Sequence, residues 1–376
     1  MINGTDTAFV LAAAGLVLLM TPGLALFYAG MVRSKNALAT IMQSLVLIAL
    51  VSLQWVWVGY SLSFGPDLGG FIGSLAWAGL RGVTTEPSTT YATTVPHLVF
   101  MIYQCMFAVI TPALIAGAFA ERMRFPAFVV FSLLWALVVY NPVCHWVWGS
   151  GGWLARLGVL DFAGGLVVHA TSGMAALAAV LVIGPRRGFG HASFMPHNLP
   201  MTMLGTGLLW FGWFGFNGGS ALAANATAAT AFVATHLAGM AGMAMWTAVE
   251  WVRLGRPTTL GAASGAIAGL GGGAELLGTQ FRLINGFGAG YGFDGVAMAL
   301  IGQLHPIATM VVALFFAVLR VGSTTMQAAT GVPTSVSDII QALVIVFSVA
   351  GMALTKLPEF QAWKDRVFSK RKAGDK

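Results

Sequence analysis

Apolar runs of about 20 residues recur along almost the whole chain, and they constrain its fold more than any other feature. A helix needs about 20 predominantly apolar residues to cross the hydrocarbon core of a bilayer. Only 8% of the 376 residues are charged, whereas soluble domains carry about 25%, so a water-facing surface cannot be built from this composition. The sequence therefore predicts an all-α, polytopic integral membrane protein. It excludes a soluble enzyme, a nucleic-acid binder and a disordered regulator.

The apolar runs predict ten spans and leave one further segment undecided. The spans are expected near residues 8–30, 40–64, 97–119, 126–148, 162–184, 198–217, 227–252, 260–278, 305–320 and 336–356. The glycine-rich segment 283–303 either crosses as a broken helix or folds back as a re-entrant segment. About 10 to 11 transmembrane helices are therefore expected.

Basic residues follow every second expected span. They are Arg33, Lys35, Arg122, Arg124, Arg186, Arg187, Arg253 and Arg256. By the positive-inside rule these loops are cytoplasmic and the N-terminus faces outward. Seven of the 19 basic residues lie from Lys356 onward, so the formal charge of +7 reports orientation and indicates no nucleic-acid partner. The basic tail 357–376 is cytoplasmic if segment 283–303 crosses.

Two ionisable side chains interrupt the fifth apolar run, where each needs a partner or a function. Asp161 begins the run, and a carboxylate before the first helical turn accepts backbone N–H groups as an N-cap. The same carboxylate would attract an arriving cation. His169 lies about 12 Å deeper on the helix. Either a packed histidine or an imidazole that lines a passage fits this pattern.

Aromatic side chains give a second signal for a cation. Phe107, Trp148 and Phe216 lie on three different expected spans, and Trp148 and Ser220 fall near the same outer surface. Most aromatic residues in membrane proteins pack or anchor the interface. A cation that has lost part of its water can also bind an aromatic face. Trp148 beside Ser220 therefore predicts a cation-recruitment site.

Other chemistry finds no support in the motifs. No Walker A phosphate loop, HExxH helix or GxSxG elbow is present, so no catalytic residue is expected. Cys105 and Cys144 fall in apolar stretches and predict packing, with no metal site and no cofactor. Glu121 lies at the end of an expected span next to a basic residue, which predicts an ion pair or a helix contact.

Five motifs in order resemble the ammonium transporter family. They are residues 22–30 (PGLALFYAG), 103–108 (YQCMFA), 120–122 (AER), 161–165 (DFAGG) with His169, and 213–217 (WFGFN) with Ser220. The resemblance runs collinearly from about residue 8 to about residue 270. It implies eleven helices in an inverted repeat of five plus five and one extra, and a homotrimer in which each subunit has its own hydrophobic pore.

The resemblance also implies a role for each matching side chain. Trp148, Phe107 and Ser220 would form the outer recruitment site for ammonium, which Asp161 would stabilise. Phe107 and Phe216 would stack as a gate below it. His169 would be one of two pore imidazoles, at which ammonium loses its proton before ammonia passes. The implied location is the inner (plasma) membrane, with ammonium, lipid and a cytoplasmic regulatory protein as partners.

The last quarter of the chain departs from this pattern. The glycine-rich Gly-x-His-Gly pattern that supplies the second imidazole is missing. His236 and His305 are the candidates to replace it, although His305 opens a span instead of lying within one. Residues 264–350 instead resemble the end of a sugar or nucleoside ABC-transporter permease. The expected domains are an ammonium transporter-like part (1–270), a permease-like segment (271–356) and the basic tail (357–376).

Four interpretations follow from these patterns. The leading hypothesis is uptake of ammonium or ammonia through a hydrophobic pore, because the five ordered motifs cover most of the chain. The alternatives are a permease subunit that moves nucleosides or sugars with a separate ATPase, and a fusion that folds without transporting. A sensor that binds ammonium is a further alternative, but the tail from Leu357 is short for an output domain.

Overall fold

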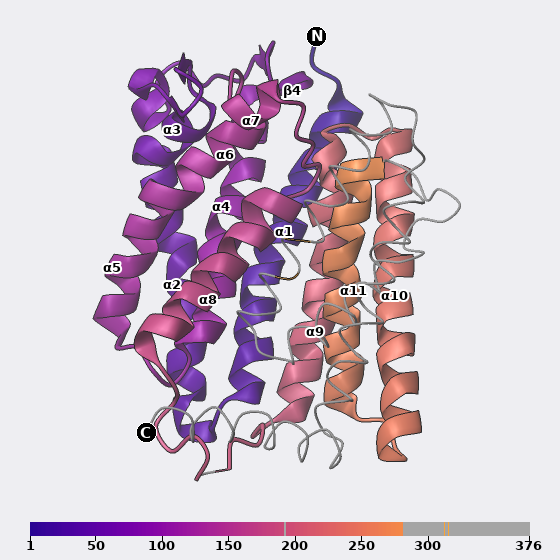
Figure 1. The fold of residues 1–376 in the computed structure, drawn as a ribbon. Helices are drawn as coiled ribbons and strands as arrows, with labels where there is room; N and C mark the ends of the chain where they lie inside the picture. Colours follow the sequence, from indigo (N-terminus) through magenta and orange to yellow (C-terminus); the bar gives the residue numbers. More distant parts are fainter. Residues whose placement is uncertain (192, 281–311, 313–314, 316–376) are drawn as a thin grey trace, which may run out of the picture. The chain divides into compact units, whose positions relative to one another are not determined.

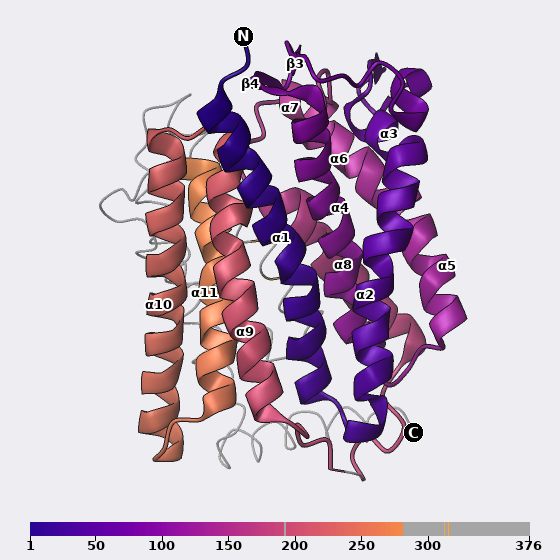
Figure 2. The same ribbon diagram turned by 180° about the vertical axis from the view of Figure 1, so that it is seen from behind.

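The computed structural model describes residues 1–191, 193–280, 312 and 315. The chain divides into two compact units, Met1–Leu283 and Ile284–Lys376. The elements described below all belong to the first unit. The axes of its long helices are roughly aligned with one another, as Figures 1 and 2 show from the two sides. The predicted all-α polytopic membrane fold is confirmed for this part of the chain.

Helices account for each of the eight spans predicted up to residue 278. The long helices are α1 (Gly4–Met31), α2 (Ala37–Gln54), α4 (His97–Phe119), α5 (Phe125–Trp135), α8 (Thr171–Ile183), α9 (Leu199–Trp213), α10 (Ala226–Leu254) and α11 (Thr259–Gln280). The short helices are α3 (Tyr60–Phe64), α6 (Asn141–Trp148) and α7 (Trp153–Arg156). The spans predicted at 305–320 and 336–356, and the segment 283–303, lie outside the described residues.

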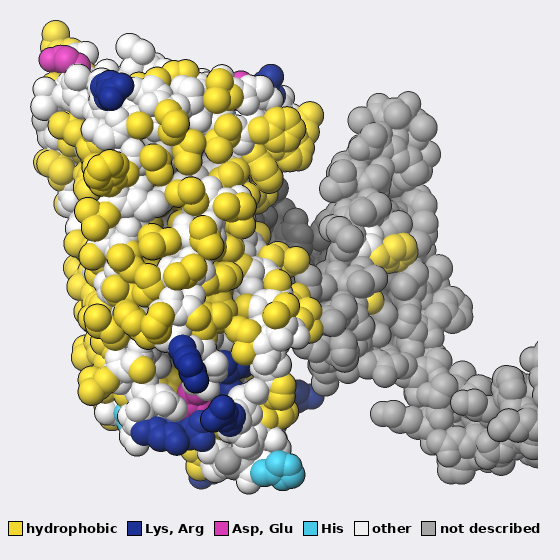
Figure 3. All heavy atoms as spheres, turned by 90° about the vertical axis from the view of Figure 1, so that its left-hand side faces the viewer, with side chains coloured by type: hydrophobic (Ala, Val, Ile, Leu, Met, Phe, Trp, Pro, Cys, Tyr) yellow, Lys and Arg dark blue, Asp and Glu magenta, His cyan; other side chains and the backbone are white. Residues whose placement is uncertain are grey.

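Six helical stretches of the described chain are long and apolar enough to cross a membrane. They are Gly4–Met31, Ser34–Phe64, His97–Phe119, Phe125–Arg156, Gly165–Ile183 and Ala226–Leu254. Figure 3 shows one face of this unit, where hydrophobic side chains cover the middle and Lys and Arg side chains gather toward one end. This distribution fits a protein whose middle is solvated by lipid.

Turns of π-helix occur at four places in the described chain, and the first three lie within these stretches. They are Trp55–Gly59, Ala136–Tyr140, Gly165–Ala170 and Phe214–Gly218. A π turn inserts one extra residue into the helix and redirects the side chains that follow, and such turns are frequent at functional sites. Two of the four hold His169 and Phe216. The helix-forming sequence does not reveal these turns, because they depend on the packing around them.

Glycines bring α1 and α9 into close contact. A Cβ atom on Gly30 would lie 2.7 Å from the backbone nitrogen of Thr202, and one on Gly205 would lie 2.7 Å from the Cα atom of Phe27. Both distances are too short for a real side chain. Small residues at such contacts let helix backbones approach in lipid, where packing rather than water drives association. The contact fixes α9, and therefore Phe216, against the N-terminal helix.

The segment between α3 and α4 folds into two small hairpins. β1 (Asp67–Leu68) pairs antiparallel with β2 (Ile72–Gly73), and β3 (Pro87–Ser88) pairs antiparallel with β4 (Ala92–Pro96). Asp67 lies opposite Gly73 in the first hairpin, and Ser88 lies opposite Ala92 in the second. The strands lie at the end of the unit that carries the N-terminus (Figure 1).

Helix α4 forms the centre of the core. Tyr103, Phe107 and Phe119 are fully buried along it, and the helix packs against α1, α2 and α8. In contrast, α8 buries only Ser172 among its residues in the described structure. Helix α4, which carries Phe107, the residue predicted to take part in recruitment and in the gate, is therefore held from several sides.

The ion pair predicted for Glu121 is present at the end opposite the hairpins, which we call the basic end. Arg33 contacts the Glu121 carboxylate through Nη2 at 2.9 Å and through Nε at 3.1 Å to each oxygen. Asn36 donates a further hydrogen bond of 2.9 Å. The contact joins the end of α1 to the loop between α4 and α5.

Candidate functional site

A small cavity lies near the hairpin end of α4, and we call it the aromatic cavity. It measures about 210 Å³. Its lining residues are Phe64, Thr90, Tyr91, Phe100, Gln104, Phe107, Trp148, Asp161, Phe162, Ser220 and Leu222. The four residues predicted for recruitment, Phe107, Trp148, Ser220 and Asp161, all line it. Residues more than 110 positions apart in sequence thus meet at one site.

The two predicted gate phenylalanines are in contact at the floor of this cavity. The ring centroids of Phe107 and Phe216 lie 4.5 Å apart at an interplanar angle of 37°. Trp148 meets Phe107 edge to face, with centroids 5.8 Å apart. Phe107 and Phe216 are each 1% exposed. A solute that leaves the cavity toward the middle of the unit therefore meets two buried rings in contact with each other.

His169 lies beyond this phenylalanine pair. Its imidazole stacks on Trp213, with centroids 5.7 Å apart, and lies 5.8 Å from the Phe216 ring. The Nε2 atom is buried and has no hydrogen-bond partner among the described residues. A buried polar atom without a partner is costly and calls for an explanation, such as a transient ligand. The ring therefore faces the gate aromatics with one nitrogen available.

Asp161 caps the π turn that carries His169, as the sequence predicts. Its carboxylate accepts hydrogen bonds of 2.6–3.0 Å from the backbone N–H groups of residues 164–167. Burial raises the pKa of Asp161, and these four hydrogen bonds oppose the rise. The backbone oxygen of Asp161 accepts a 2.7 Å hydrogen bond from Trp148 Nε1. Asp161 thus holds both the indole and the start of the His169 segment.

Tyr103 is a site residue that the sequence analysis did not single out. Its hydroxyl lies 2.9 Å from the Gly215 carbonyl, 3.0 Å from the Phe216 carbonyl and 3.3 Å from Ser220 Oγ. The side chain is fully buried. Ser220 Oγ in turn donates to the Phe216 carbonyl at 2.8 Å. Tyr103 therefore fixes the π turn of Phe216 against α4 and leaves the lone pairs of Ser220 toward the cavity.

Gln104 was also missed. It lines the aromatic cavity, and its Oε1 atom is buried without a hydrogen-bond partner among the described residues. A carbonyl oxygen in this position can accept a hydrogen bond from a cationic donor. Its place one residue after Tyr103 in the motif 103–108 was the available sequence signal.

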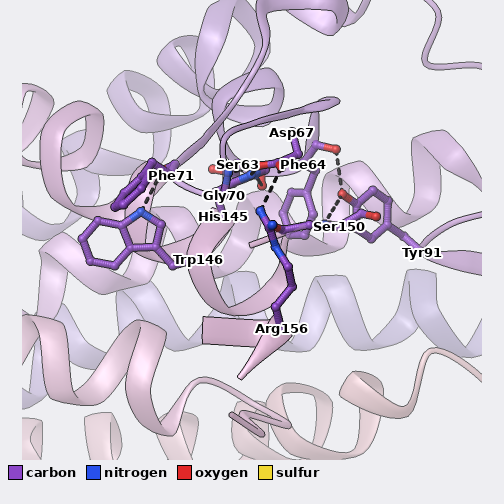
Figure 4. A network of polar contacts seen from close by, with 11 residues as sticks. Ser63, Phe64, Asp67, Gly70, Phe71, Tyr91, His145, Trp146, Ser150 and Arg156 are labelled. Atoms are coloured by element: carbon purple, nitrogen blue, oxygen red, sulfur yellow. Dashed lines mark hydrogen bonds and ion pairs between the residues drawn. The ribbon is translucent and has the colours of Figure 1, made fainter. Parts of the chain in front are cut away.

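A polar network supports the wall of the cavity from the hairpin side, as Figure 4 shows. Tyr91 donates to the Phe64 carbonyl at 2.8 Å and accepts from the Ser150 backbone N–H at 2.9 Å. Nearby, the fully buried His145 places Nδ1 3.0 Å from the Ser63 carbonyl and Nε2 2.9 Å from Asp67 Oδ1. This network ties the hairpin segment to α6.

Asp67 joins a third element to the same network. Its second oxygen lies 3.2 Å from Arg156 Nη2 of α7, and Gly70 donates a backbone hydrogen bond of 2.7 Å to its first. The hydrogen bond from His145 lowers the pKa of Asp67, burial opposes this, and Gly70 and Arg156 lower the pKa further. An ionised carboxylate therefore links α6, α7 and the first hairpin.

His236, the alternative pore imidazole, packs elsewhere. Its ring lies 5.6 Å from Trp210 and 6.1 Å from Phe214. His169 instead packs on Trp213 and Phe216, so the two imidazoles contact different aromatic pairs of the α9 region. His305 lies outside the described residues. Within the described ranges, no group of three His, Cys, Asp or Glu side chains is arranged to hold a metal ion.

Two family models match the chain. The Ammonium Transporter Family matches residues 8–291, and the Branched-chain amino acid transport system / permease component matches residues 257–349. Both resemblances predicted from the sequence are therefore confirmed, with an overlap in and after α11.

The sequence relatives carry the same description as the first family. The chain is 58% identical over 265 residues to an ammonium transporter of Bacillus subtilis, covering 70% of this chain and 64% of the relative. It is 50% identical over 265 residues to ammonium transporter Amt1 of Archaeoglobus fulgidus, covering 70% of this chain and 65% of that one. The chain thus spans less than two thirds of the length of both relatives.

A solved structure agrees with the sequence relatives. The crystal structure of Candida albicans Mep2 superposes with a TM-score of 0.72 at 30% identity, covering 96% of this chain and 86% of that one. The match of the family model over residues 8–291 covers the described helical unit from residue 8 onward and includes every residue that lines the aromatic cavity. The chain belongs to the ammonium transporter family.

Proposed function

We propose that the chain transports ammonium or ammonia through the passage that begins at the aromatic cavity and continues past Phe107, Phe216 and His169. The observation that carries the proposal is this succession. A cavity with cation-binding groups leads to two buried rings in contact at a tilted angle, and beyond them lies an imidazole nitrogen without a partner among the described residues. The relatives described as ammonium transporters support the choice of substrate.

Recruitment of ammonium would use groups that favour a cation without a direct ion pair. Phe107 and Trp148 offer aromatic faces, and cation–π attraction contributes about 0.5–2 kcal/mol. Ser220 has committed its proton to the Phe216 carbonyl, so its lone pairs are free to accept an N–H group. The carboxylate of Asp161 is occupied by backbone N–H groups. We infer that it acts by its charge and by holding Trp148.

Selectivity would come from the cost of dehydration at the gate. Phe107 and Phe216 provide no polar atom to replace the water around potassium or sodium ions, so these ions pay the full cost. Ammonium can instead transfer one proton to solvent water on the cavity side of the gate, and the ammonia that remains crosses the apolar constriction as a neutral molecule. His169 Nε2, when it carries the lone pair, accepts a hydrogen bond from the migrating nitrogen.

Flux into liposomes tests the proposal. The purified full chain is reconstituted, and ammonium and methylammonium uptake are followed by stopped-flow fluorescence of a trapped pH indicator and by electrical recording. We expect flux above empty liposomes, and a loss of at least tenfold in His169→Ala and in Phe216→Ala. Flux that equals empty liposomes, or that is unchanged in both variants, contradicts the proposal.

A matched control separates a pore effect from a folding effect. Phe214 lies two positions before Phe216 in the same π turn but stacks on Phe232, with centroids 4.0 Å apart. It does not line the aromatic cavity. Phe214→Ala should therefore keep most of the flux while removing a ring of the same size. Equal losses in Phe214→Ala and Phe216→Ala would point to destabilised helices instead of a gate.

The assembly and orientation belong to the same proposal. We infer a homotrimer with one passage in each subunit, in the plasma membrane, with the N-terminus outside and the basic end in the cytoplasm. Support comes from the family and from the eight basic residues in alternate loops. Cross-linking in membranes and labelling of single introduced cysteines from either side test these points. A cytoplasmic regulatory protein would bind at the basic end.

The division of the chain is likewise proposed. We assign residues 1–270 to the ammonium transporter-like part, 271–356 to a permease-like segment and 357–376 to a basic cytoplasmic tail. The competing function is a permease subunit for nucleosides or sugars. The second family, which matches residues 257–349, is described as a permease component of a branched-chain amino acid transport system, so it supports a permease but not this substrate class. Co-purification of an ATPase, and uptake of a labelled nucleoside that depends on it, would support that function over ammonium transport.

A further inference from the structure

A second cavity lies at the basic end, and we call it the arginine cavity. It measures about 590 Å³ and is built from the ends of α1, α4, α8 and α11 with the loop before α9. Its lining residues are Tyr28, Met31, Val32, Leu114, Gly117, Ala118, Ala120, Arg122, Ala176, Arg186, Phe194, Pro196 and Leu260. Helix α4 carries Phe107 nearer the other end of the unit, and the π turn that precedes α8 carries His169.

Two guanidinium groups face this cavity with incomplete partners. Arg122 donates through Nη1 to the Gly184 carbonyl at 3.0 Å, but its Nε atom is buried and has no hydrogen-bond partner in the described part of the chain. Arg186 lies over the Phe194 ring at 4.2 Å. Its Nη1 atom reaches Glu121 only at 3.8 Å. Both side chains therefore keep donors that a ligand could use.

The nearby carboxylate does not neutralise these two groups, because it is already engaged by other donors. Burial disfavours the ionised form of Glu121, yet the hydrogen bonds from Arg33 and Asn36 outweigh it and lower the pKa of Glu121 to about 2. Its side chain is 1% exposed. Two guanidinium groups, those of Arg33 and Arg186, thus lie within 4 Å of one carboxylate, and only Arg33 makes a close ion pair with it.

The excess positive charge carries an electrostatic cost. Burial lowers the pKa of Arg122, and the charge of Arg186 lowers it further. The Arg122 guanidinium nonetheless stays protonated, because the ordinary pKa of arginine is above 12. Two like charges beside one cavity repel each other, and an anion between them would relieve this repulsion.

The ligand that fits is an anion with several acceptor oxygens. Guanidinium groups bind phosphate oxygens in paired, planar geometry, and the donors here come from two different loops. The remaining walls are apolar, with Met31, Val32 and Leu114 on one side and Leu260 on another. Such walls add nothing for a small inorganic ion but accommodate the glycerol and first methylene groups of a lipid.

We propose that the arginine cavity binds a phosphate group held by Arg122 and Arg186. The phosphate belongs either to a soluble ion or ester or to the headgroup of an anionic phospholipid, and both sources use the same donors. The proposal does not depend on transport of ammonium, because it concerns equilibrium binding at the basic end.

Two binding measurements on the purified full chain test the site and identify the source. Isothermal titration with inorganic phosphate in a neutral detergent reports the soluble ligand. Native mass spectrometry after exposure to phosphatidylglycerol, compared with phosphatidylcholine, reports the lipid. We expect binding in at least one measurement, weakened on the order of tenfold in Arg186→Gln, because hydrogen bonds to charged groups contribute about 1.5–3 kcal/mol.

Neighbouring arginines provide matched controls. Arg187 follows Arg186, and Arg124 lies two residues after Arg122, but neither lines the cavity. Arg187→Gln and Arg124→Gln should bind as the unchanged chain does. Arg122→Lys keeps the charge but removes Nε, and it should lose about as much affinity as Arg122→Gln. If Arg122 variants fail to fold, Arg186→Gln alone decides the test.

Three outcomes would overturn the proposal. The first is that titration with phosphate gives no heat of binding above buffer alone, and that phosphatidylglycerol binds no more tightly than phosphatidylcholine. The second is that Arg187→Gln weakens binding as much as Arg186→Gln, which would indicate a diffuse basic surface. The third is that Arg186→Gln leaves both affinities unchanged.

Discussion

The aromatic cavity and the arginine cavity lie toward opposite ends of α4. The buried carboxylate near each cavity is compensated by different groups. At the aromatic cavity, the carboxylate of Asp161 is satisfied by four backbone N–H groups. None of the described residues that line this cavity is Lys or Arg. At the arginine cavity, a carboxylate is satisfied by Arg33, and two further guanidinium groups remain.

Because of this difference, the two ends of the helical unit interact differently with a cation. A negative charge held by neutral backbone groups leaves a net field that attracts a cation to the aromatic cavity. Excess guanidinium groups at the arginine cavity repel one. A cation that enters at the first cavity thus has no favourable site at the second, whereas neutral ammonia is indifferent to both. The contrast agrees with the proposed loss of a proton at the gate.

The largest expected effect comes from removing the carboxylate that organises the aromatic cavity. Asp161→Ala leaves four backbone N–H groups without their acceptor and releases the π turn of His169. Because hydrogen bonds to charged groups contribute about 1.5–3 kcal/mol each and are not additive, we expect a loss of about 4 kcal/mol in the free energy of unfolding. Unfolding in mixed micelles of increasing SDS content measures it.

Asp161→Asn separates the charge from the fold. The amide keeps one acceptor oxygen, so we expect a smaller loss of stability. If attraction of the cation comes from the charge, ammonium affinity should fall in Asp161→Asn even where stability is largely retained. Equal ammonium affinity in Asp161→Asn and the unchanged chain would break the electrostatic contrast between the two cavities.

The next effect concerns the buried ion pair of the basic end. Glu121→Gln removes a carboxylate that is 1% exposed and leaves Arg33 without its partner, which costs about 3 kcal/mol. The pKa of Glu121 is lowered from 4.5 to about 2. The stability that the ionised group contributes is therefore full above about pH 4.5 and is lost as the pH falls toward 2.

Unfolding measured from pH 7 down to pH 2 checks this dependence. The unchanged chain should lose stability in the window below pH 4.5, and Glu121→Gln should show a shallower loss there. Parallel curves for the two proteins would mean that Glu121 does not ionise differently in the folded chain. The basic end would then have no buried pair to contrast with Asp161.

Much of this arrangement was accessible from the sequence, and the limits are physical. Apolar length predicted the helices, and basic residues in alternate loops predicted the cluster at one end. The motifs brought Phe107, Ser220, Asp161 and Phe216 forward, and the pattern of aromatic residues added Trp148. The structure places all of them at or beside one cavity, and the role of each in transport stays a prediction.

The missed features depend on geometry that spacing does not encode. The π turn at Phe214–Gly218 changes which side chains face α4, and an α-helical register would not align Tyr103 with two successive carbonyls. The hairpins between α3 and α4 contain too few residues to give an alternating pattern. The arginine cavity combines loops that are distant in sequence, so its two incompletely partnered guanidinium groups come together only after folding.

A smaller effect should follow from removing the hydroxyl of Tyr103. Tyr103→Phe keeps the ring but removes one donor from the carbonyls of Gly215 and Phe216, at a cost of about 1–2 kcal/mol. If the hydroxyl positions Ser220 for ammonium, KM should rise several-fold with little change in the maximal flux. Tyr60→Phe, which removes a buried hydroxyl bonded to His97, is the control and should leave KM unchanged.

A change in maximal flux without a change in KM in Tyr103→Phe would assign the hydroxyl to the gate instead of to recruitment. Loss of stability in Tyr103→Phe equal to that in Tyr60→Phe, with neither flux parameter altered, would assign it to packing alone. Either result would remove Tyr103 from the aromatic cavity as a positioning residue.

The smallest effect is expected at the second ion pair, on the hairpin side of the aromatic cavity. Arg156 is 58% exposed where it meets Asp67, whereas Arg33 is 29% exposed where it meets the buried Glu121. An exposed pair gains little because water screens it, so Arg156→Gln should change the free energy of unfolding by less than about 0.5 kcal/mol.

Asp67→Ala should cost about 1–2 kcal/mol, because the buried His145 also loses a partner. Thermal unfolding of the two variants at low and high salt checks the order, since only the exposed pair should respond to salt. A loss in Arg156→Gln as large as that in Glu121→Gln would show that the two ends of the unit depend equally on ion pairs.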